Sequence, residues 1–116
     1  MAITEFFAGI AATDYEALRD WYERLLGRPP DFLPHDTEAV WQIAESGWLY
    51  VVADPDRAGS ALITILVDDL DTQVSELAAR GLTAGSPEAV AGAVRKAEIV
   101  DPEGNKVTFA EVPPES

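Results

Sequence analysis

The chain of 116 residues contains no cysteine and a single histidine, His35. The absence of thiols excludes disulfides, thiolate nucleophiles and cysteine-ligated zinc or iron–sulfur sites, and one imidazole leaves little room for histidine chemistry. Basic residues are also scarce, since 8 Lys and Arg against 21 Asp and Glu give a net charge of −13. Phosphate backbones and anionic membrane surfaces repel such a chain. We therefore expect neither nucleic acid nor a membrane among its partners.

Long apolar runs are missing as well. No segment of the sequence approaches the roughly 18 apolar residues that a membrane-spanning helix needs, and the first residues lack the basic start and apolar run of a signal peptide. We therefore expect a cytoplasmic protein. The apolar fraction of 47% and the charged fraction of 25% are ordinary for a globular protein, and the length suits one domain of about 100 to 150 residues.

The first periodic pattern predicts a helix within residues 13–27. Thr13 and Glu16 have the spacing of a capping box, and Gly27 is a natural left-handed terminator. Apolar residues recur at helical spacing, at Tyr15, Leu18, Tyr22 and Leu25. A second, shorter pattern of the same kind predicts a helix within residues 69–81.

Short apolar or alternating runs predict the strands. The two irregular stretches, 29–38 and 82–93, are predicted as loops, each with room for one further short strand. The order of strand, helix and strands repeats after about 55 residues, which divides the chain into modules of about 1–55 and 59–114. The predicted strands lie within residues 4–12, 39–45, 47–53, 61–69, 94–100 and 106–112.

Two segments resemble the vicinal oxygen chelate superfamily, which includes glyoxalase I, extradiol dioxygenases and the bleomycin-resistance proteins. The first is "TDYEALRDWYERLLG", with its aromatic pair and terminal Leu-Gly, and the second is "DPEGNKVTF", similar to the family's turn and last strand. The resemblance implies an α+β fold over residues 1–116, built from two tandem βαβββ modules whose curved mixed sheets form a cup. It also implies a homodimer, because chains of this size in the family commonly pair.

Metal-dependent members of that family place histidine or glutamate at four equivalent strand positions, and the matching positions here are Phe7, Val51, Leu62 and Thr108. Three of these side chains carry no oxygen or nitrogen donor, and the fourth offers only a neutral hydroxyl. We therefore expect no metal at the family position and no other cofactor. The family also includes members whose cup encloses a hydrophobic or aromatic small molecule without metal. We predict that this chain is of that binding type, of the kind that sequesters a compound or confers resistance to it.

Aromatic residues on the predicted hairpin 39–53 extend the set of candidate ligand-binding residues. Trp41, Trp48 and Tyr50 could stack on a planar ligand, although Trp41 and Trp48 could instead fill the core or a dimer interface. Strand alternation places Phe7 on the face predicted to line the cup.

Glu98 is the last candidate ligand-binding residue. The internal repeat aligns Glu98 with Trp41, so the two should face the same way. Whether Glu98 and Lys96, or instead Ala97 and Ile99, line the cup stays open.

Two other functions remain open. The first is a lyase, isomerase or dioxygenase-like enzyme of the same superfamily, with a metal held by unanticipated carboxylates or with acid–base chemistry through His35 or Glu98. The second is a dimeric ferredoxin-like βαββαβ scaffold, which needs only one strand after its second helix, whereas this sequence offers two. The sequence leaves open the ligand, the presence of any catalysis, and whether the modules pair within the chain or across a dimer.

Overall fold

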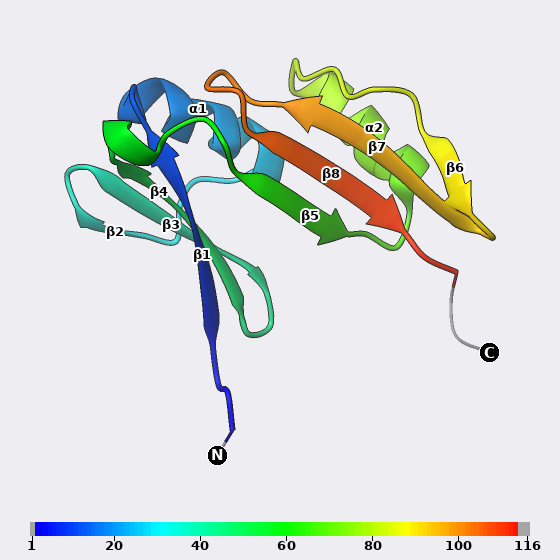
Figure 1. The fold of residues 1–116 in the computed structure, drawn as a ribbon, viewed down its shortest axis with the longest axis horizontal. Helices are drawn as coiled ribbons and strands as arrows, with labels where there is room; N and C mark the ends of the chain where they lie inside the picture. The colour runs from blue at the N-terminus through cyan, green and yellow to red at the C-terminus, as the bar shows by residue number, and fades with distance from the viewer. Residues whose placement is uncertain (1, 114–116) are drawn as a thin grey trace. The chain divides into compact units, whose positions relative to one another are not determined.

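The computed structural model describes residues 2–113 and divides the chain into two compact units, Met1–Ser60 and Ala61–Ser116. Each unit has the order βαβββ (Figure 1). The predicted α+β fold of two tandem βαβββ modules is therefore confirmed. Three strands follow the second helix, which excludes the ferredoxin-like alternative. Among the described residues, no helix has both the length and the apolar character to cross a bilayer.

The two sheets have the same topology. In the first unit the strand order is β1-β4-β3-β2, with β1 parallel to β4 and the other pairs antiparallel. In the second unit the order is β5-β8-β7-β6, with β5 parallel to β8. The elements of the first unit are β1 (Phe6–Ala12), α1 (Tyr15–Leu26), β2 (Phe32–His35), β3 (Glu38–Ala44) and β4 (Gly47–Ala53), followed by a 3₁₀ turn, Pro55–Arg57. Those of the second unit are β5 (Leu62–Leu66), α2 (Leu70–Ala79), β6 (Glu88–Ala91), β7 (Val94–Val100) and β8 (Lys106–Glu111).

Helix α1 begins one residue later than its capping pattern suggested. Asp14, in an extended conformation, is the N-cap, and its side chain accepts a hydrogen bond from the Ala17 backbone N–H at 3.2 Å. The prediction that Thr13 caps the helix is therefore wrong by one residue. Gly27 ends the helix as predicted, with φ of 77° and its N–H donating to the Glu23 carbonyl.

Strands β2 and β6 lie in the two stretches that were predicted as loops. Each has four exposed residues, so neither shows the buried or alternating pattern that marks a strand. Pro34 is compatible with β2 because β2 is an edge strand, which in the described part of the chain pairs with β3 alone.

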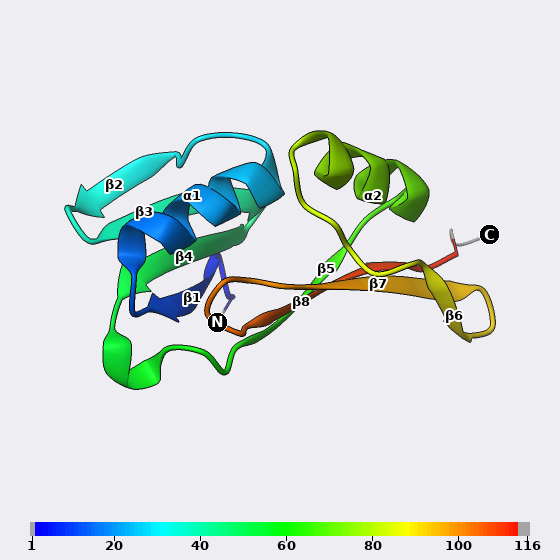
Figure 2. The ribbon, with the colours of Figure 1, turned by 90° about the horizontal axis from the view of Figure 1, so that it is seen from above.

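Each helix lies against one face of the sheet in its own unit (Figure 2). Strand alternation sends every second side chain toward the helix and the others to the opposite face, which we call the open face. The buried strand residues under α1 are Ile10, Ala12, Ala39, Trp41, Leu49 and Val51. The first open face carries Phe7, Gly9, Ala11, Phe32, His35, Glu38, Val40, Gln42, Trp48, Tyr50 and Val52, and the second open face carries Leu62, Thr64, Leu66, Glu88, Lys96, Glu98, Val100, Lys106, Thr108 and Ala110.

The turn "DPEGN" fastens the last hairpin to the start of β5. Asp101 Oδ1 accepts the backbone N–H groups of Glu103 and Asn105, both at 2.9 Å, and Asp101 Oδ2 accepts Asn105 Nδ2 at 2.7 Å. Asn105 Oδ1 in turn accepts the backbone N–H of Ala61 at 2.8 Å. Asp101 and Asn105 are only 4% and 1% exposed, so these bonds satisfy polar groups that have lost water. The motif therefore has a structural role, which we call a structural lock: it stabilises the turn between β7 and β8 and holds it to the residue before β5.

Candidate functional site

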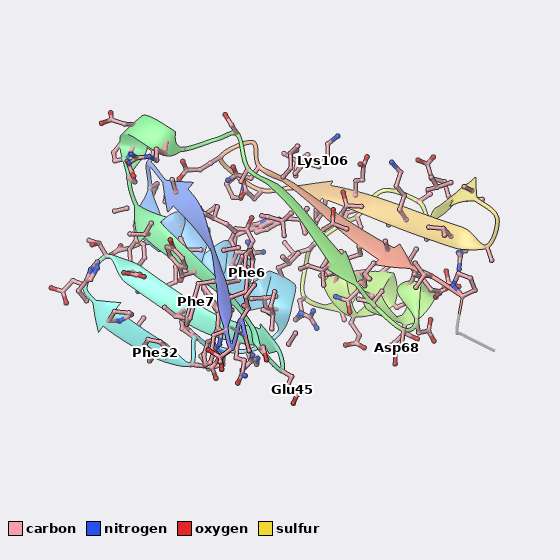
Figure 3. The ribbon with its side chains drawn as sticks, turned by 60° about the horizontal axis from the view of Figure 1, so that its bottom comes forward. Phe6, Phe7, Phe32, Glu45, Asp68 and Lys106 are labelled. Atoms are coloured by element: carbon pink, nitrogen blue, oxygen red, sulfur yellow. The ribbon has the colours of Figure 1, made fainter. Side chains whose placement is uncertain are left out.

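The first open face carries a cluster of aromatic rings, of which Phe7 and Phe32 are exposed and Trp48 is half-buried. Phe7 on β1 and Trp48 on β4 are direct neighbours in the parallel register, and their rings stack with centroids 5.4 Å apart and an interplanar angle of 13°. Phe32 on β2 meets Trp48 edge to face at 6.0 Å and 67°. Figure 3 shows the positions of Phe7 and Phe32. Phe7 is 49% exposed and Phe32 46%, so the cluster offers its apolar surface to a ligand.

Tyr50 completes this surface by lying over the backbone of β1. Gly9 is opposite Tyr50 in the register, and a Cβ placed on Gly9 would come within 2.3 Å of Tyr50 Cζ. Only glycine therefore leaves room for the ring in this position. We call Phe7, Phe32, Trp48 and Tyr50 the aromatic platform.

Hydrogen bonds hold the platform's surroundings in place. Trp48 Nε1 donates to Glu5 Oε2 at 2.8 Å, which fixes the indole ring. Asp31 Oδ2 accepts the Gln42 backbone N–H at 2.6 Å, and Asp31 also pairs with Arg28 at 3.0 Å. The hydrogen bond from Gln42 and, after it, the charge of Arg28 lower the pKa of Asp31 below its ordinary value. This carboxylate therefore fastens the segment before β2 to strand β3.

Two residues predicted to line the cup lie on the helix side of the sheet instead. Trp41 and Val51 are both 0% exposed, and Trp41 Nε1 donates to the Arg28 carbonyl at 3.0 Å. Their placement on the open face is therefore wrong, and the alternative that Trp41 fills the core is correct. The expectation that Glu98 and Trp41 face the same way is also wrong, because Glu98 lies on the open face.

Val51 was predicted on the wrong face because the turns of the two modules differ by one residue. Gly47 is itself the first residue of β4, whereas Gly104 is followed by Asn105 before β8 begins. Residues at the same distance from Gly47 and from Gly104 therefore point to opposite faces of their sheets, since side chains alternate with a period of two. Tyr50, and not Val51, is the open-face counterpart of Thr108.

The second open face is more polar. Thr64, Thr108 and Glu98 form one row across β5, β8 and β7, because Thr64 pairs with Thr108 and Thr108 pairs with Glu98. Leu62 lies on the same face and is 81% exposed. The structure thus shows which residues of β7 lie on the open face: Lys96 and Glu98 do, whereas Ala97 and Ile99 are buried on the helix side.

His35 lies at the end of β2, with its side chain 56% exposed. Its Nε2 is 2.9 Å from Glu38 Oε1, and its Nδ1 is 3.1 Å from Thr37 Oγ1. Both ring nitrogens therefore have protein partners, and a general-base role would require breaking one of these contacts.

The donor set does not fit a divalent cation at the positions that the resemblance suggests. Phe7, Leu62 and Val51 have no donor atom, and Thr108 and Tyr50, which takes the place of Val51 on the open face, offer only hydroxyl groups. Zn²⁺, Mn²⁺ or Fe²⁺ sites use carboxylate, imidazole or thiolate ligands instead. Between residues 2 and 113, no three His, Asp or Glu side chains gather in a way that could hold a metal ion.

Comparisons with solved structures identify the fold and the family. The glyoxalase/bleomycin resistance protein from Catenulispora acidiphila DSM 44928 is 45% identical, with a TM-score of 0.89 over 96% of this chain and 100% of that one. TnmS3, an antibiotic binding protein from Streptomyces sp. CB03234, is 22% identical, with a TM-score of 0.77 over 97% and 99%. A bleomycin-binding protein complexed with bleomycin is 20% identical, with a TM-score of 0.73 over 90% and 95%. No family model and no curated protein matches the sequence. The similarity to the Catenulispora protein along nearly the whole chain shows that this protein belongs to the glyoxalase/bleomycin resistance family.

Proposed function

We propose that the protein binds a small hydrophobic or aromatic organic molecule on the aromatic platform, without a metal ion. The stacking of the half-buried Trp48 on the exposed Phe7 is the observation that carries this proposal. A planar ligand laid on these rings removes apolar surface from water on both sides, which contributes about 25 cal/mol for each Å² buried. The role that follows is sequestration of the ligand.

Two of the structural relatives support a binding role. TnmS3 is an antibiotic binding protein, and the bleomycin-binding protein was solved with bleomycin bound. The side chains at the family's metal positions support the metal-free part of the proposal, because they do not fit a divalent cation. Enzymes that hold substrate oxygens on a metal depend on the Lewis acidity of that ion. The platform uses apolar contact instead.

Tryptophan fluorescence tests this proposal. Trp21 and Trp41 are 6% and 0% exposed, so a ligand on the platform should quench Trp48 and leave the other two unchanged. We expect saturable quenching by at least one compound in a panel of bleomycin, uncharged anthraquinones and related planar aromatics. Trp48→Phe should abolish this signal, whereas the control Trp21→Phe should retain it.

Two outcomes would contradict the proposal. One is the absence of saturable quenching across the whole panel. The other is equal quenching in Trp48→Phe and in the unchanged protein, which would locate the ligand elsewhere.

We also propose that the protein forms a homodimer. Among the described strands, β1 has a neighbour on one side only, and Ile3 and Phe6, which precede and begin it, are 89% and 66% exposed. Sedimentation equilibrium should give twice the monomer mass for the unchanged protein and a monomer for Phe6→Glu. A monomeric mass for the unchanged protein at micromolar concentration would refute this part.

A further inference from the structure

Both lysines of the chain meet at one carboxylate on the second open face. Lys96 Nζ and Lys106 Nζ are each 3.7 Å from Glu98 Oε2. The lysines come from different strands, β7 and β8, and Glu98 lies between them. Figure 3 shows Lys106 at the start of β8.

The cluster is a local exception to the chain's excess of negative charge. Five arginines have at least one carboxylate partner each, whereas two lysines share Glu98. Glu88 on β6 is opposite Lys96 in the register and brings a second carboxylate to the same face, so this face is about neutral in a chain whose total charge is −13. The five arginine pairs are Arg19–Asp20, Arg28–Asp31, Arg57–Asp54, Arg80–Glu76 and Arg95 with Asp71 and Glu111.

The two ammonium groups keep hydrogen-bonding capacity for a ligand. A separation of 3.7 Å exceeds the N–H···O range of about 2.7–3.2 Å, so neither contact with Glu98 is a hydrogen bond. Each ammonium carries three donors. The side chains of Lys96 and Lys106 are 35% and 49% exposed, so an incoming anion can reach both.

The surroundings of the lysines select an anion with an apolar part. Thr64 and Thr108, in one row with Glu98, add hydroxyl groups to the same face. Leu62, Leu66 and Val100 are 81%, 64% and 57% exposed on that face. A ligand carboxylate can take the place of Glu98 beside the two ammonium groups, and an aliphatic chain can cover the exposed leucines.

We propose that the second open face binds a small carboxylic acid with an apolar chain, whose carboxylate is held by Lys96 and Lys106. When no ligand is bound, the Glu98 carboxylate pairs with both lysines, and it therefore competes with the ligand carboxylate for them. This site uses a different sheet, different residues and a different ligand chemistry from the aromatic platform, so it stands or fails separately from the proposed function.

Amide chemical shifts in a titration with hexanoate test the proposal, with hexan-1-ol as the uncharged match. We expect saturable shifts at the backbone amides of Lys96, Glu98 and Thr108 with hexanoate, and much weaker effects with the alcohol. Lys96→Gln and Lys106→Gln should each weaken hexanoate binding about two- to fivefold, the effect of losing one exposed ion pair. Glu98→Gln should strengthen binding by a similar factor because it removes the competing carboxylate.

Matched changes of charge in the first unit provide the control. Arg57→Gln removes a cation whose side chain is 80% exposed, and Glu23→Gln removes an exposed carboxylate from α1. Neither should change hexanoate affinity. Equal shifts with hexanoate and hexan-1-ol would overturn the proposal. So would unchanged affinity in both lysine variants, or the same loss of affinity in Arg57→Gln. Dispersed amide spectra of each variant establish that it is folded, and none of these readouts depends on Trp48.

Discussion

Replacing Asn105 by alanine should destabilise the protein by about 3 kcal/mol. The substitution removes the bond from Asn105 Nδ2 to Asp101 Oδ2 at 2.7 Å and the bond from the Ala61 N–H to Asn105 Oδ1 at 2.8 Å. A hydrogen bond to a charged group contributes about 1.5–3 kcal/mol and a neutral one about 1 kcal/mol, and buried partners left without a bond add to the loss. Because a domain of this size is stable by only about 5–15 kcal/mol, the change is large.

Urea unfolding followed by circular dichroism measures this loss. We expect a lower midpoint at an unchanged slope, and a melting temperature reduced by about 10 °C. Ser75→Ala, at an exposed position on α2, is the control and should change stability by less than about 0.5 kcal/mol. If Asn105→Ala and Ser75→Ala unfold at the same urea concentration, the reasoning that "DPEGN" is a structural lock is refuted.

Three further predictions concern the first unit. Gly9→Ala should displace the Tyr50 ring and weaken binding of a planar ligand about fivefold, measured by fluorescence titration, and unchanged affinity would argue against a role for Tyr50. Val51→Ala should cost about 2 kcal/mol in urea unfolding with ligand affinity unchanged, because Val51 is buried on the helix side, whereas Tyr50→Ala should weaken binding at little cost in stability. The pKa of Asp31 is lowered chiefly by the hydrogen bond from Gln42, so its stabilising contribution is complete above the unfolded-state value of about 4 and is lost as the pH falls through the lower folded value. Asp31→Asn should therefore flatten the dependence of the urea midpoint on pH below about 4, and an unchanged slope there would contradict this assignment.

The fold could be predicted from the sequence because its signals are local. The apolar period from Tyr15 to Leu25 defined α1, and the structure buries the residues of that stripe. Strands β4 and β7 begin and end at the predicted residues. The bounds of the edge strands β2 and β6 could not be predicted, since all their residues are exposed and their pairing with β3 and β7 decides their conformation.

The candidate site was harder to predict because a sheet face depends on register. A difference of one residue between the turns before β4 and β8 placed Val51 on the wrong side and hid Tyr50 as the counterpart of Thr108. Phe32 was missed because it belongs to β2, which carries it to Trp48. The signal that could have located the Tyr50 ring was Gly9, an interruption in an otherwise apolar strand that often marks a close approach.

The central claim is that the aromatic platform binds an organic ligand without metal, and one measurement tests both parts. Trp48 quenching by the best ligand of the panel would be titrated in protein treated with a chelator and in protein supplied with Zn²⁺, Mn²⁺, Fe²⁺ or Ni²⁺. We predict the same dissociation constant in all samples, since the platform of Phe7, Phe32, Trp48 and Tyr50 offers aromatic rings and no charged ligand for an ion. Quenching that disappears on chelation and returns with one of these metals would contradict the account.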